Sequence, residues 1–528
     1  MSKSVLPKRT ASHSDDPERG HDDLERAHQQ PVPAVINSKE REPSTETHGD
    51  RSSNDGDEFH KIIVGWNTHE DCEHPYNLPR WRINATAALL AMLAFLVPFS
   101  SAIMSPATSQ MMEDFNSSSE LLQAFMVSVF VLGNAFGPLI WAPLSEIYGR
   151  FYIYHGTNVA FVALTVGCAL APSLSVLIAL RFLAGLFGGA VLANGGASIA
   201  DMMPPAKRGL FMGLFILGPV MGPAVGPICG GFLSTAKGWR WVFWLVAILA
   251  GFVTIMMALV TRETYAPVLL QRKLEHLRQA TGIPGVGLGR SRDMETISWR
   301  TILWQGIIRP MKLLVTSPIS ALCALNMAVA YGILNLLITS ISIVYQETYS
   351  WSANISGLAF IGLGCGTFSG TMIISGTSDK YGASAAAKDG SGQRKPEYRL
   401  FLLPFGGLLL PAGLFIFGWT AEYKVHWIVP MIGEALIGVG IMIIFMSTTL
   451  YLIESYAMYA ASALAANGFM RSIGGGLLPL AGLTMYSNLG VGWGNSVLAF
   501  IALLIPPISL VLQWYGEKLR KNYEPKIL

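Results

Sequence analysis

The stretch Gly218-Pro-Val-Met-Gly-Pro-Ala-Val-Gly-Pro-Ile-Cys-Gly-Gly231 lies inside a long apolar run of the chain. Its glycines recur every four residues, so on a helix they form one smooth stripe that another helix can approach closely. Prolines run beside the stripe, and a membrane helix tolerates them because neighbouring helices satisfy the freed carbonyl groups. The motif positions are Gly218, Pro219, Gly222, Pro223, Gly226, Pro227 and Gly230. Two interpretations are open: a close-packed helix contact, or a bent helix at a moving interface between two bundles.

The composition of the whole chain is typical of a protein that crosses the membrane many times. Of its 528 residues, 51% are hydrophobic and 13% are charged, which excludes most soluble classes. The net charge of +3 gives no indication of nucleic-acid binding. The five cysteines are scattered without the spacing of metal ligands, so no metal site is predicted. The first expected partner is therefore the lipid bilayer.

Polar segments divide the chain into two apolar halves. Residues 1–82 are rich in charges and poor in aliphatic residues, which predicts a disordered tail. Twelve apolar stretches follow, each of about 20 residues and long enough to cross a bilayer. They lie near 84–104, 121–142, 152–170, 175–201, 208–234, 240–261, 318–345, 354–378, 399–420, 427–454, 459–487 and 493–515. The polar stretch 262–317 separates six from six, which predicts bundles at 83–261 and 318–516 and a tail at 517–528.

Lysine and arginine indicate the orientation of these stretches. The loops on one side carry 21 of these residues, whereas those on the other carry three, Lys237, Arg240 and Lys424. Because positive charge gathers in cytosolic loops, both termini and the central loop are predicted to be cytosolic, in a multi-pass protein of the plasma membrane. Asn116 and Asn354 then face outside in Asn-x-Ser sequons and are predicted glycosylation sites.

The two halves repeat one another. The acid, tyrosine and glycine within 146–149 match those within 379–382 at an offset of 233 residues, and Asp201 matches Glu454 at an offset of 253. Two six-helix halves related by a repeat are typical of transporters, whose substrate site lies between the halves. No catalytic constellation is present, so the chain is predicted not to be an enzyme.

Further segments stand beside the stretch at 218–231: Pro75-Tyr-Asn-Leu-Pro-Arg-Trp81, Pro143-Leu-Ser-Glu146 with Gly149-Arg150, Arg181-Phe-Leu-Ala-Gly185, Glu263-Thr-Tyr-Ala-Pro267, Tyr451-Leu-Ile-Glu454, and Ala460-Ala-Ser-Ala463 with Arg471-Ser472. In combination, these segments resemble the major facilitator superfamily, and most of all its fungal twelve-span drug–proton antiporters, the branch of multidrug, cycloheximide and polyamine exporters. In this resemblance the stretch at 218–231 matches the antiporter motif. The resemblance covers about residues 70–520.

The resemblance implies an all-α membrane protein with the major facilitator fold, its twelve transmembrane helices forming two six-helix pseudo-repeat bundles. It implies a monomer that carries a small molecule and exchanges it for protons, with the proton gradient in place of a cofactor. The cavity is expected between the bundles, with Phe99, Tyr331, Asn335 and Asn467 as candidate lining residues.

Three charged residues lie inside apolar stretches: Arg181, Glu434 and Arg471. An intramembrane charge costs roughly 2.5–3.5 kcal/mol on insertion scales, so each needs a reason. One interpretation is structural ion pairing within a bundle, and the other is a proton or substrate relay. Desolvation favours the neutral form of a buried carboxyl group, which makes Glu434 the first candidate for a reversible proton carrier. The repeat would allow Arg181 to approach it across the pseudo-two-fold axis.

A second set of charges is expected at the cytosolic surface, and by resemblance it acts as a gate. The resemblance implies that Arg150 pairs with Asp201, the acid that ends the fourth span. In the second half Ala383 stands where Arg150 would be, so the acids there are predicted to act through Lys380 alone. The alternative is that these charges only set topology. The gate residues are Glu146, Gly149, Arg150, Asp201, Asp379, Lys380 and Glu454.

The glycine stripe has a predicted partner in the eighth span, where Gly362, Gly366 and Gly370 are again four apart. This expectation follows the resemblance, in which the fifth and eighth helices meet between the halves. Gly133 and Gly137 of the second span, with 474–476 of the eleventh, would form the other such contact.

The predicted function is therefore proton-coupled efflux of a small organic compound, such as a drug, toxin or secondary metabolite, by alternating access, with multidrug resistance as its consequence. A polyamine exporter or a nutrient importer of the same fold is the alternative among transporters. A non-transporting membrane receptor or scaffold is the alternative of another class.

Overall fold

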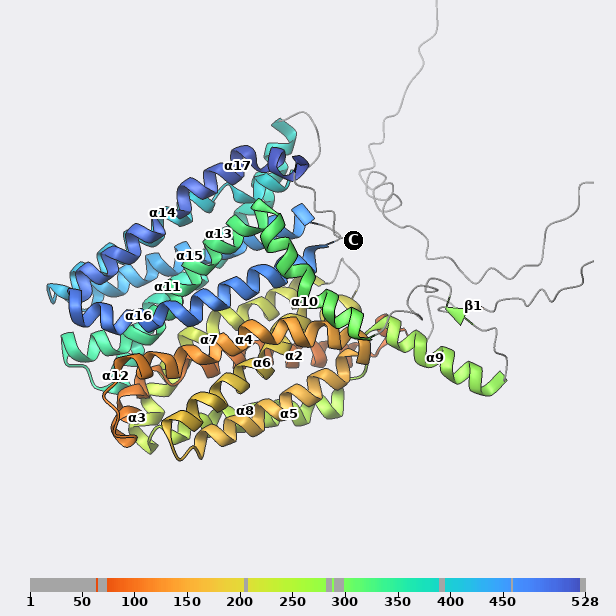
Figure 1. Ribbon diagram of the computed structural model, residues 1–528, viewed down its shortest axis with the longest axis horizontal. Coiled ribbons are helices and arrows are strands. Elements are labelled where there is room, and N and C mark those ends of the chain that lie inside the picture. The colour runs from red at the N-terminus through yellow and green to blue at the C-terminus, as the bar shows by residue number, and fades with distance from the viewer. Residues whose placement is uncertain are drawn as a thin grey trace, which may run out of the picture. The chain divides into compact units, whose positions relative to one another are not determined.

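The computed structural model describes residues 63–64, 74–203, 208–281, 287–288, 299–388, 395–456 and 459–522. They belong to two compact units. One unit comprises Met1–His74 and Leu270–Arg292, and in it β1 (Ile63–Val64) pairs in parallel with β2 (Gly287–Leu288). The other comprises Pro75–Leu269 and Asp293–Leu528 and contains both helical halves (Figure 1). Of the tail predicted at 1–82, residues 1–62 and 65–73 lie outside the described residues.

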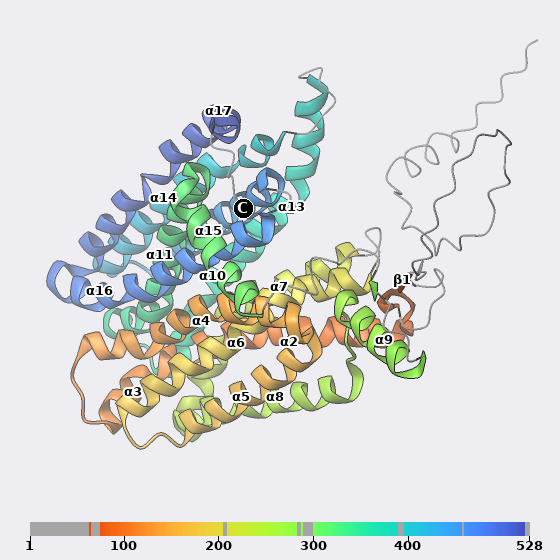
Figure 2. The same ribbon diagram turned by 45° about the vertical axis from the view of Figure 1, so that its right-hand side comes forward.

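Long helices form both halves of the larger unit. The N-terminal half contains α2 (Arg80–Ala102), α3 (Thr108–Asp114), α4 (Glu120–Tyr148), α5 (Arg150–Ala169), α6 (Leu174–Met202), α7 (Arg208–Lys237) and α8 (Arg240–Val260). The central segment contains α9 (Ala266–Thr281), most of which belongs to the smaller unit, and α10 (Trp299–Thr316). The C-terminal half contains α11 (Pro318–Tyr349), α12 (Ala353–Ser356), α13 (Phe360–Lys388), α14 (Leu403–Glu422), α15 (Ile428–Tyr456), α16 (Ala460–Ala502) and α17 (Ile505–Asn522). In Figures 1 and 2 the helices of each half lie together.

The described helices account for twelve membrane crossings. Ten apolar helical segments are long enough to span a membrane. One of them, Ala460–Asn522, holds two crossings, because Gly490 has a φ of 78° and divides α16. The twelfth is α5, 20 residues long and less apolar than the ten. The all-α, twelve-helix architecture predicted from the sequence is confirmed.

Local chemistry accounts for where several helices begin and end. The hydroxyls of Ser119 and Ser173 accept the backbone N–H groups of Leu122 and Val176, which caps the first turns of α4 and α6. Gly149 separates α4 from α5 at a φ of 93°, a conformation that residues with a Cβ rarely adopt. Helix α7 runs without interruption through its three interior prolines.

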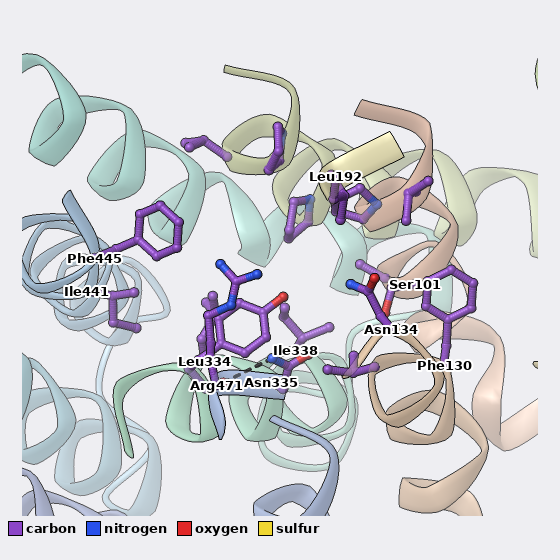
Figure 3. Close-up of a pocket in the computed structure, with 18 of the residues that line it drawn as sticks. Ser101, Phe130, Asn134, Leu192, Leu334, Asn335, Ile338, Ile441, Phe445 and Arg471 are labelled. Carbon is purple, nitrogen blue, oxygen red and sulfur yellow. Dashed lines mark hydrogen bonds between the residues drawn. The ribbon is translucent and has the colours of Figure 1, made fainter. Parts of the chain in front are cut away.

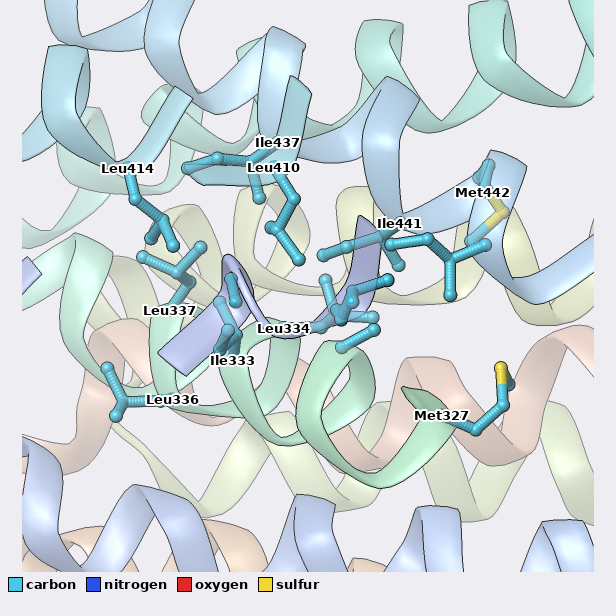
Figure 4. Packing of buried hydrophobic residues seen from close by; sticks show 14 of the residues in the cluster. Met327, Ile333, Leu334, Leu336, Leu337, Leu410, Leu414, Ile437, Ile441 and Met442 are labelled. Carbon is cyan, nitrogen blue, oxygen red and sulfur yellow. The ribbon is translucent and has the colours of Figure 1, made fainter. Parts of the chain in front are cut away.

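Each half has its own apolar core. In the C-terminal half, α14 contributes Leu410 and Leu414, and α15 contributes Ile437 and Ile441, all buried against α11 (Figure 4). The core of the N-terminal half is formed mainly by residues of α2, α5, α6 and α8. Val220 of α7 joins the core of the C-terminal half, so the halves share an apolar seam.

The glycine stripe of α7 faces α2 in the same half. A Cβ added to any of these glycines would meet backbone atoms of α2. The added Cβ would lie 2.7 Å from Phe95 N at Gly218, 2.8 Å from Phe99 N at Gly222 and 3.0 Å from Phe99 O at Gly226. At Gly230 it would lie 1.7 Å from the carbonyl oxygen of Ile103, the residue that directly follows α2. The prediction that this stripe faces the eighth span is wrong, and the stripe is a close helix contact inside one bundle.

The other predicted glycine faces also pack mostly within a half. Cβ atoms at the three glycines of α13 would meet the α15 carbonyl oxygens of Met431, Ala435 and Val439. Gly133 and Gly137 face α6, and Gly474 and Gly475 face α11. Of the predicted set, Gly476 does reach the other half, where it meets Leu132 of α4. Four-residue glycine spacing therefore marks close helix neighbours, whichever bundle they belong to.

The two halves also meet through residues outside these glycine stripes. A Cβ on Gly364 of α13 would lie 2.8 Å from the Cβ of Ala224, which is on α7 but off the stripe. At the end of the bundles that carries α3 and α12, Ser487 donates a hydrogen bond to Glu120 Oε2 at 3.2 Å. At that end Ser105 also donates to the carbonyl of Ile338. The end with α3 and α12 is hereafter the α3 end, and the end where α4 meets α5 is the α5 end.

We expect glycosylation at Asn116 in preference to Asn354. Asn116 is exposed in the turn between α3 and α4, whereas Asn354 is half-buried and its Oδ1 accepts a hydrogen bond from Ser352 at 2.5 Å. In a glycosylating host, Asn116→Gln should remove the mobility shift that an endoglycosidase produces, and Asn84→Gln should not. A glycan on Asn84, near the start of α2, would contradict the predicted orientation.

Candidate functional site

A cavity lies between the two halves and is enclosed by their helices. Its described lining comes from α2, α4, α6 and α7 of one half and from α11, α15 and α16 of the other. Pro219 and Pro223, from the 218–231 stretch of α7, are among the lining residues. Its volume is about 180 Å³, below the roughly 300–1,000 Å³ of pockets that hold drug-sized ligands. A ligand of that size therefore requires the halves to move apart.

Arg471 of α16 reaches this cavity from the C-terminal half (Figure 3). Its guanidinium carbon lies 4.9 Å from the ring centre of Tyr331 and 5.2 Å from that of Phe445. Its Nε is buried and has no hydrogen-bond partner in the described part of the chain. Cation–π contacts of this kind hold a guanidinium while leaving its donors available.

The N-terminal wall presents small polar groups. Asn134 of α4 and Ser101 of α2 line the cavity across from Arg471 (Figure 3). Asn134 is 9% exposed, and its Oδ1 has no hydrogen-bond partner among the described residues. From the opposite wall Asn335 donates to the carbonyl of Tyr331 at 2.9 Å. The cavity thus combines an apolar lining with a few amide and hydroxyl groups.

Arg181 lies behind this wall. Its side chain is 1% exposed, and it donates to the carbonyl oxygens of Ser100 at 2.8 Å and Ser101 at 3.1 Å. Its guanidinium carbon also lies 4.7 Å from the ring centre of Phe130. The arginine therefore ties α6 to α2 within its own half.

Glu434 is fully buried within the C-terminal half. It lies on α15 near Gly362 of α13, whose added Cβ would be 3.1 Å from Oε2, and beside the hydroxyl of Tyr345 on α11. By geometry neither carboxyl oxygen has a hydrogen-bond partner among the described residues. Arg181 binds α2 carbonyls in the other half, so the expected approach of Arg181 to Glu434 is not present.

The four predicted cavity residues divide into two pairs. Tyr331 and Asn335 line the cavity. Phe99 is 3% exposed and stacks on Phe95 at 5.2 Å in the core of the N-terminal half. Asn467 is 4% exposed, with a buried Oδ1 that has no partner in the described part of the chain, and it is not among the lining residues.

Charged residues form a network at the α5 end of the N-terminal half. The Nε of Arg150 donates to Asp201 Oδ2 at 2.6 Å, so the structure brings together the pair that the resemblance implied. The guanidinium of Arg150 also covers the ring of Tyr265 at 5.1 Å. Glu146 is exposed nearby, in the field of Arg150 and of Arg309 on α10. Burial raises the pKa of the Tyr265 phenol, which keeps it neutral beside this pair.

Glu263, which follows α8, holds this network together. Its carboxylate accepts backbone N–H groups of Arg150 at 3.0 Å, Phe151 at 3.2 Å, and Thr264 and Tyr265 at 2.9 Å each. It therefore caps the positive end of α5. A Cβ on Gly149 would lie 2.1 Å from Glu263 Oε2. Sequence reasoning quoted Glu263 in a motif but gave it no role, although an acid following a predicted span was the available signal.

We expect Glu263→Ala to lower the stability of the folded protein strongly. The substitution leaves four N–H groups without their acceptor, and each buried unsatisfied donor costs about 1–3 kcal/mol. The thermal unfolding midpoint of the purified protein in detergent should fall by many degrees. Glu347→Ala, at an exposed glutamate of α11, is the control and should leave the midpoint unchanged. An unchanged midpoint for Glu263→Ala would contradict the capping role.

The C-terminal half has a matching network built around Arg399. This arginine donates to Asp379 Oδ1 and Glu454 Oε1, each at 2.7 Å, and to Ser378 Oγ at 2.9 Å. Lys380 is exposed. The prediction that these acids act through Lys380 alone is wrong, because the missing arginine comes from the end of the longer loop that precedes α14.

The comparisons agree with this architecture. The sequence profile of the Major Facilitator Superfamily matches residues 90–479. The chain is 46% identical to the MFS-type transporter atr4 of Stereocaulon alpinum, over 87% of this chain and 82% of that one. It is 43% identical to the efflux pump radE of Floropilus chiversii, over 87% of this chain and 85% of that one. A crystal structure of a D-xylose–proton symporter shares the fold, with a TM-score of 0.61, 16% identity, and coverage of 82% of this chain and 97% of that one.

Two six-helix halves around a shared cavity are the architecture of a membrane transporter. The chain belongs to the Major Facilitator Superfamily, in its family of fungal efflux transporters. Its relatives and structural neighbours are transporters and not enzymes.

Proposed function

We propose that this protein exports small organic molecules across the plasma membrane in exchange for protons, as a monomer with both termini in the cytosol. The observation that carries the proposal is the cavity, which both halves line and which lies next to the prolines of the antiporter-like stretch. The name of a relative as an efflux pump supports the direction of transport. The excess of lysine and arginine on one side supports the orientation.

The ion-pair networks support alternating access. Arg150 with Asp201, and Arg399 with Asp379 and Glu454, stand at corresponding places of the two halves. These pairs are partly buried, and a transporter needs only a small difference in free energy between its two states. In this proposal the pairs bias the equilibrium between inward-open and outward-open forms.

Glu434 is the proposed proton site. Lys and Arg side chains cannot alternate charge easily at neutral pH, whereas a buried carboxyl group can bind and release a proton as its surroundings change. Of the three intramembrane charges, Glu434 alone is an acid. Arg181 and Arg471 then serve the helix contacts and the cavity.

A dye-accumulation experiment tests the proposal. Cells that express the chain, and cells with an empty vector, are loaded with a panel of anionic, neutral and cationic fluorescent dyes. We expect less of at least one dye in expressing cells, and a protonophore should remove the difference. Greater accumulation would indicate an importer, and no difference for any dye would indicate a receptor or scaffold; both results contradict the proposal.

A further inference from the structure

We propose that the molecule carried through the cavity is an organic anion, with a mostly apolar, ring-bearing body and a carboxylate or equally acidic group that binds Arg471. This inference rests on the proposed function and adds the charge of the substrate. It follows from the charged groups that line the cavity: an arginine is among the described lining residues and a carboxylate is not.

Arg471 is the one charged side chain among the described residues that line the cavity. Aromatic rings flank its guanidinium, and its buried Nε lacks a hydrogen-bond partner in the described part of the chain. A guanidinium offers paired N–H donors that match the two oxygens of a carboxylate. Cation–π contacts do not use these donors, so an anionic ligand can take them.

The other polar groups of the lining lie where they can contact the rest of the ligand. Asn134 and Ser101 face the cavity from the N-terminal half, and Asn335 faces it from α11 (Figure 3). The buried Oδ1 of Asn134 has no partner among the described residues, and as an acceptor it can take a hydroxyl or N–H group on the body of the ligand. The rest of the lining is apolar, with Phe130, Phe445 and Pro98 able to contact a ring.

The distribution of charge argues against a cationic substrate. No aspartate or glutamate occurs among the described lining residues. Arg181 adds a second positive charge behind the wall, compensated by carbonyl oxygens rather than by carboxylates. In a cavity of low polarity, a protonated amine beside Arg471 would be repelled, and an anion attracted. This separates the substrate from polyamines, which carry several positive charges.

Matched ligands test the inference on the purified full-length protein in lipid nanodiscs. The probes are 2-naphthoate, 2-naphthamide and 2-naphthylmethylammonium, with the corresponding biphenyl and anthracene sets. In equilibrium binding, we expect carboxylates to bind at least tenfold more tightly than the amide and ammonium of the same ring. Arg471→Gln should abolish this preference, Arg471→Lys should keep part of it, and the control Arg262→Gln, at an exposed arginine, should keep all of it.

Three results would overturn the inference: no carboxylate binds, the ammonium binds as tightly, or the preference survives Arg471→Gln. If Arg471→Gln does not fold, as judged by gel filtration and thermal unfolding, the wild-type comparison and Arg471→Lys still decide. Failure of the proposed function is distinguishable. Proton-driven export of a cationic dye would uphold export and contradict the anion, whereas selective carboxylate binding without any proton-driven transport would uphold the anion alone.

Discussion

Gly230→Ala is expected to remove most of the protein from the membrane. An added Cβ would lie 1.7 Å from the carbonyl oxygen of Ile103 and 2.8 Å from its carbonyl carbon. Both atoms are backbone, so relief requires α7 to move away from the backbone at the C-terminal end of α2. Overpacking of a well-packed core typically costs about 1–3 kcal/mol, and a clash with backbone should lie at the upper end.

The measurement is the amount of tagged protein in purified membranes, with transport per molecule recorded beside it. Gly213→Ala is the matched control, because Gly213 lies on the same helix and a Cβ there has no neighbour within 4 Å. Gly222→Ala and Gly226→Ala, with approaches of 2.8 and 3.0 Å, should give intermediate losses. Normal amounts of Gly230→Ala with lost transport would instead indicate that this contact opens during the cycle.

Composition and the apolar stretches were sufficient to predict the membrane spans, because a bilayer imposes helix length and charge asymmetry directly on the sequence, and the family resemblance supplied the fold. The predicted third span, 152–170, corresponds to α5 (Arg150–Ala169), and the divided final pair corresponds to α16 and α17. The pairing of Arg150 with Asp201 was also predicted, because the resemblance supplied both positions.

The partner of the glycine stripe was not predictable from spacing. Glycines four apart show that a backbone lies close, but they do not identify the helix to which it belongs. The fifth span contacts the eighth through residues of the same stretch that lie off the stripe: Ala224 against Gly364, Pro227 against Gly357, and Gly231 against Ala353. Four-residue spacing on one helix cannot identify contacts that are made by residues off the stripe.

Arg399 and Glu263 escaped prediction for a related reason. Each acts on groups far along the chain: Arg399 reaches Glu454, and Glu263 reaches the backbone of Arg150. The repeat suggested an arginine directly after Gly382, where Ala383 stands. The longer loop instead supplies Arg399, 17 residues after Gly382. The fold conserves the position of the positive charge in space while the sequence position differs between the halves.

Glu434 lies on a helix that also lines the cavity, and it contacts a second such helix. Ile441, which lines the cavity, is two turns farther along the same face of α15, about 10 Å away at 1.5 Å per residue. Tyr345, beside Glu434, is likewise two turns from Ile338 of the lining on α11. Gly362 of α13 packs against the same carboxyl group, and α13 meets α7 of the other half. A change of charge at Glu434 would therefore act on helices that form both the cavity and the seam.

Glu434→Gln is expected to leave a folded protein in normal amount and to abolish proton-driven export. Glutamine has nearly the shape of a protonated glutamate, so the buried site keeps its packing, but glutamine cannot bind and release a proton. The test uses liposomes containing the protein and an exported dye: wild type should accumulate dye when a pH gradient is imposed, and Glu434→Gln should not. Dye exchange without a gradient should persist in the variant, because the cavity is unchanged. Glu347→Gln, the same substitution at an exposed position, should behave as wild type. Undiminished gradient-driven accumulation in Glu434→Gln would exclude this residue as the proton site and leave it a packing role in the C-terminal half.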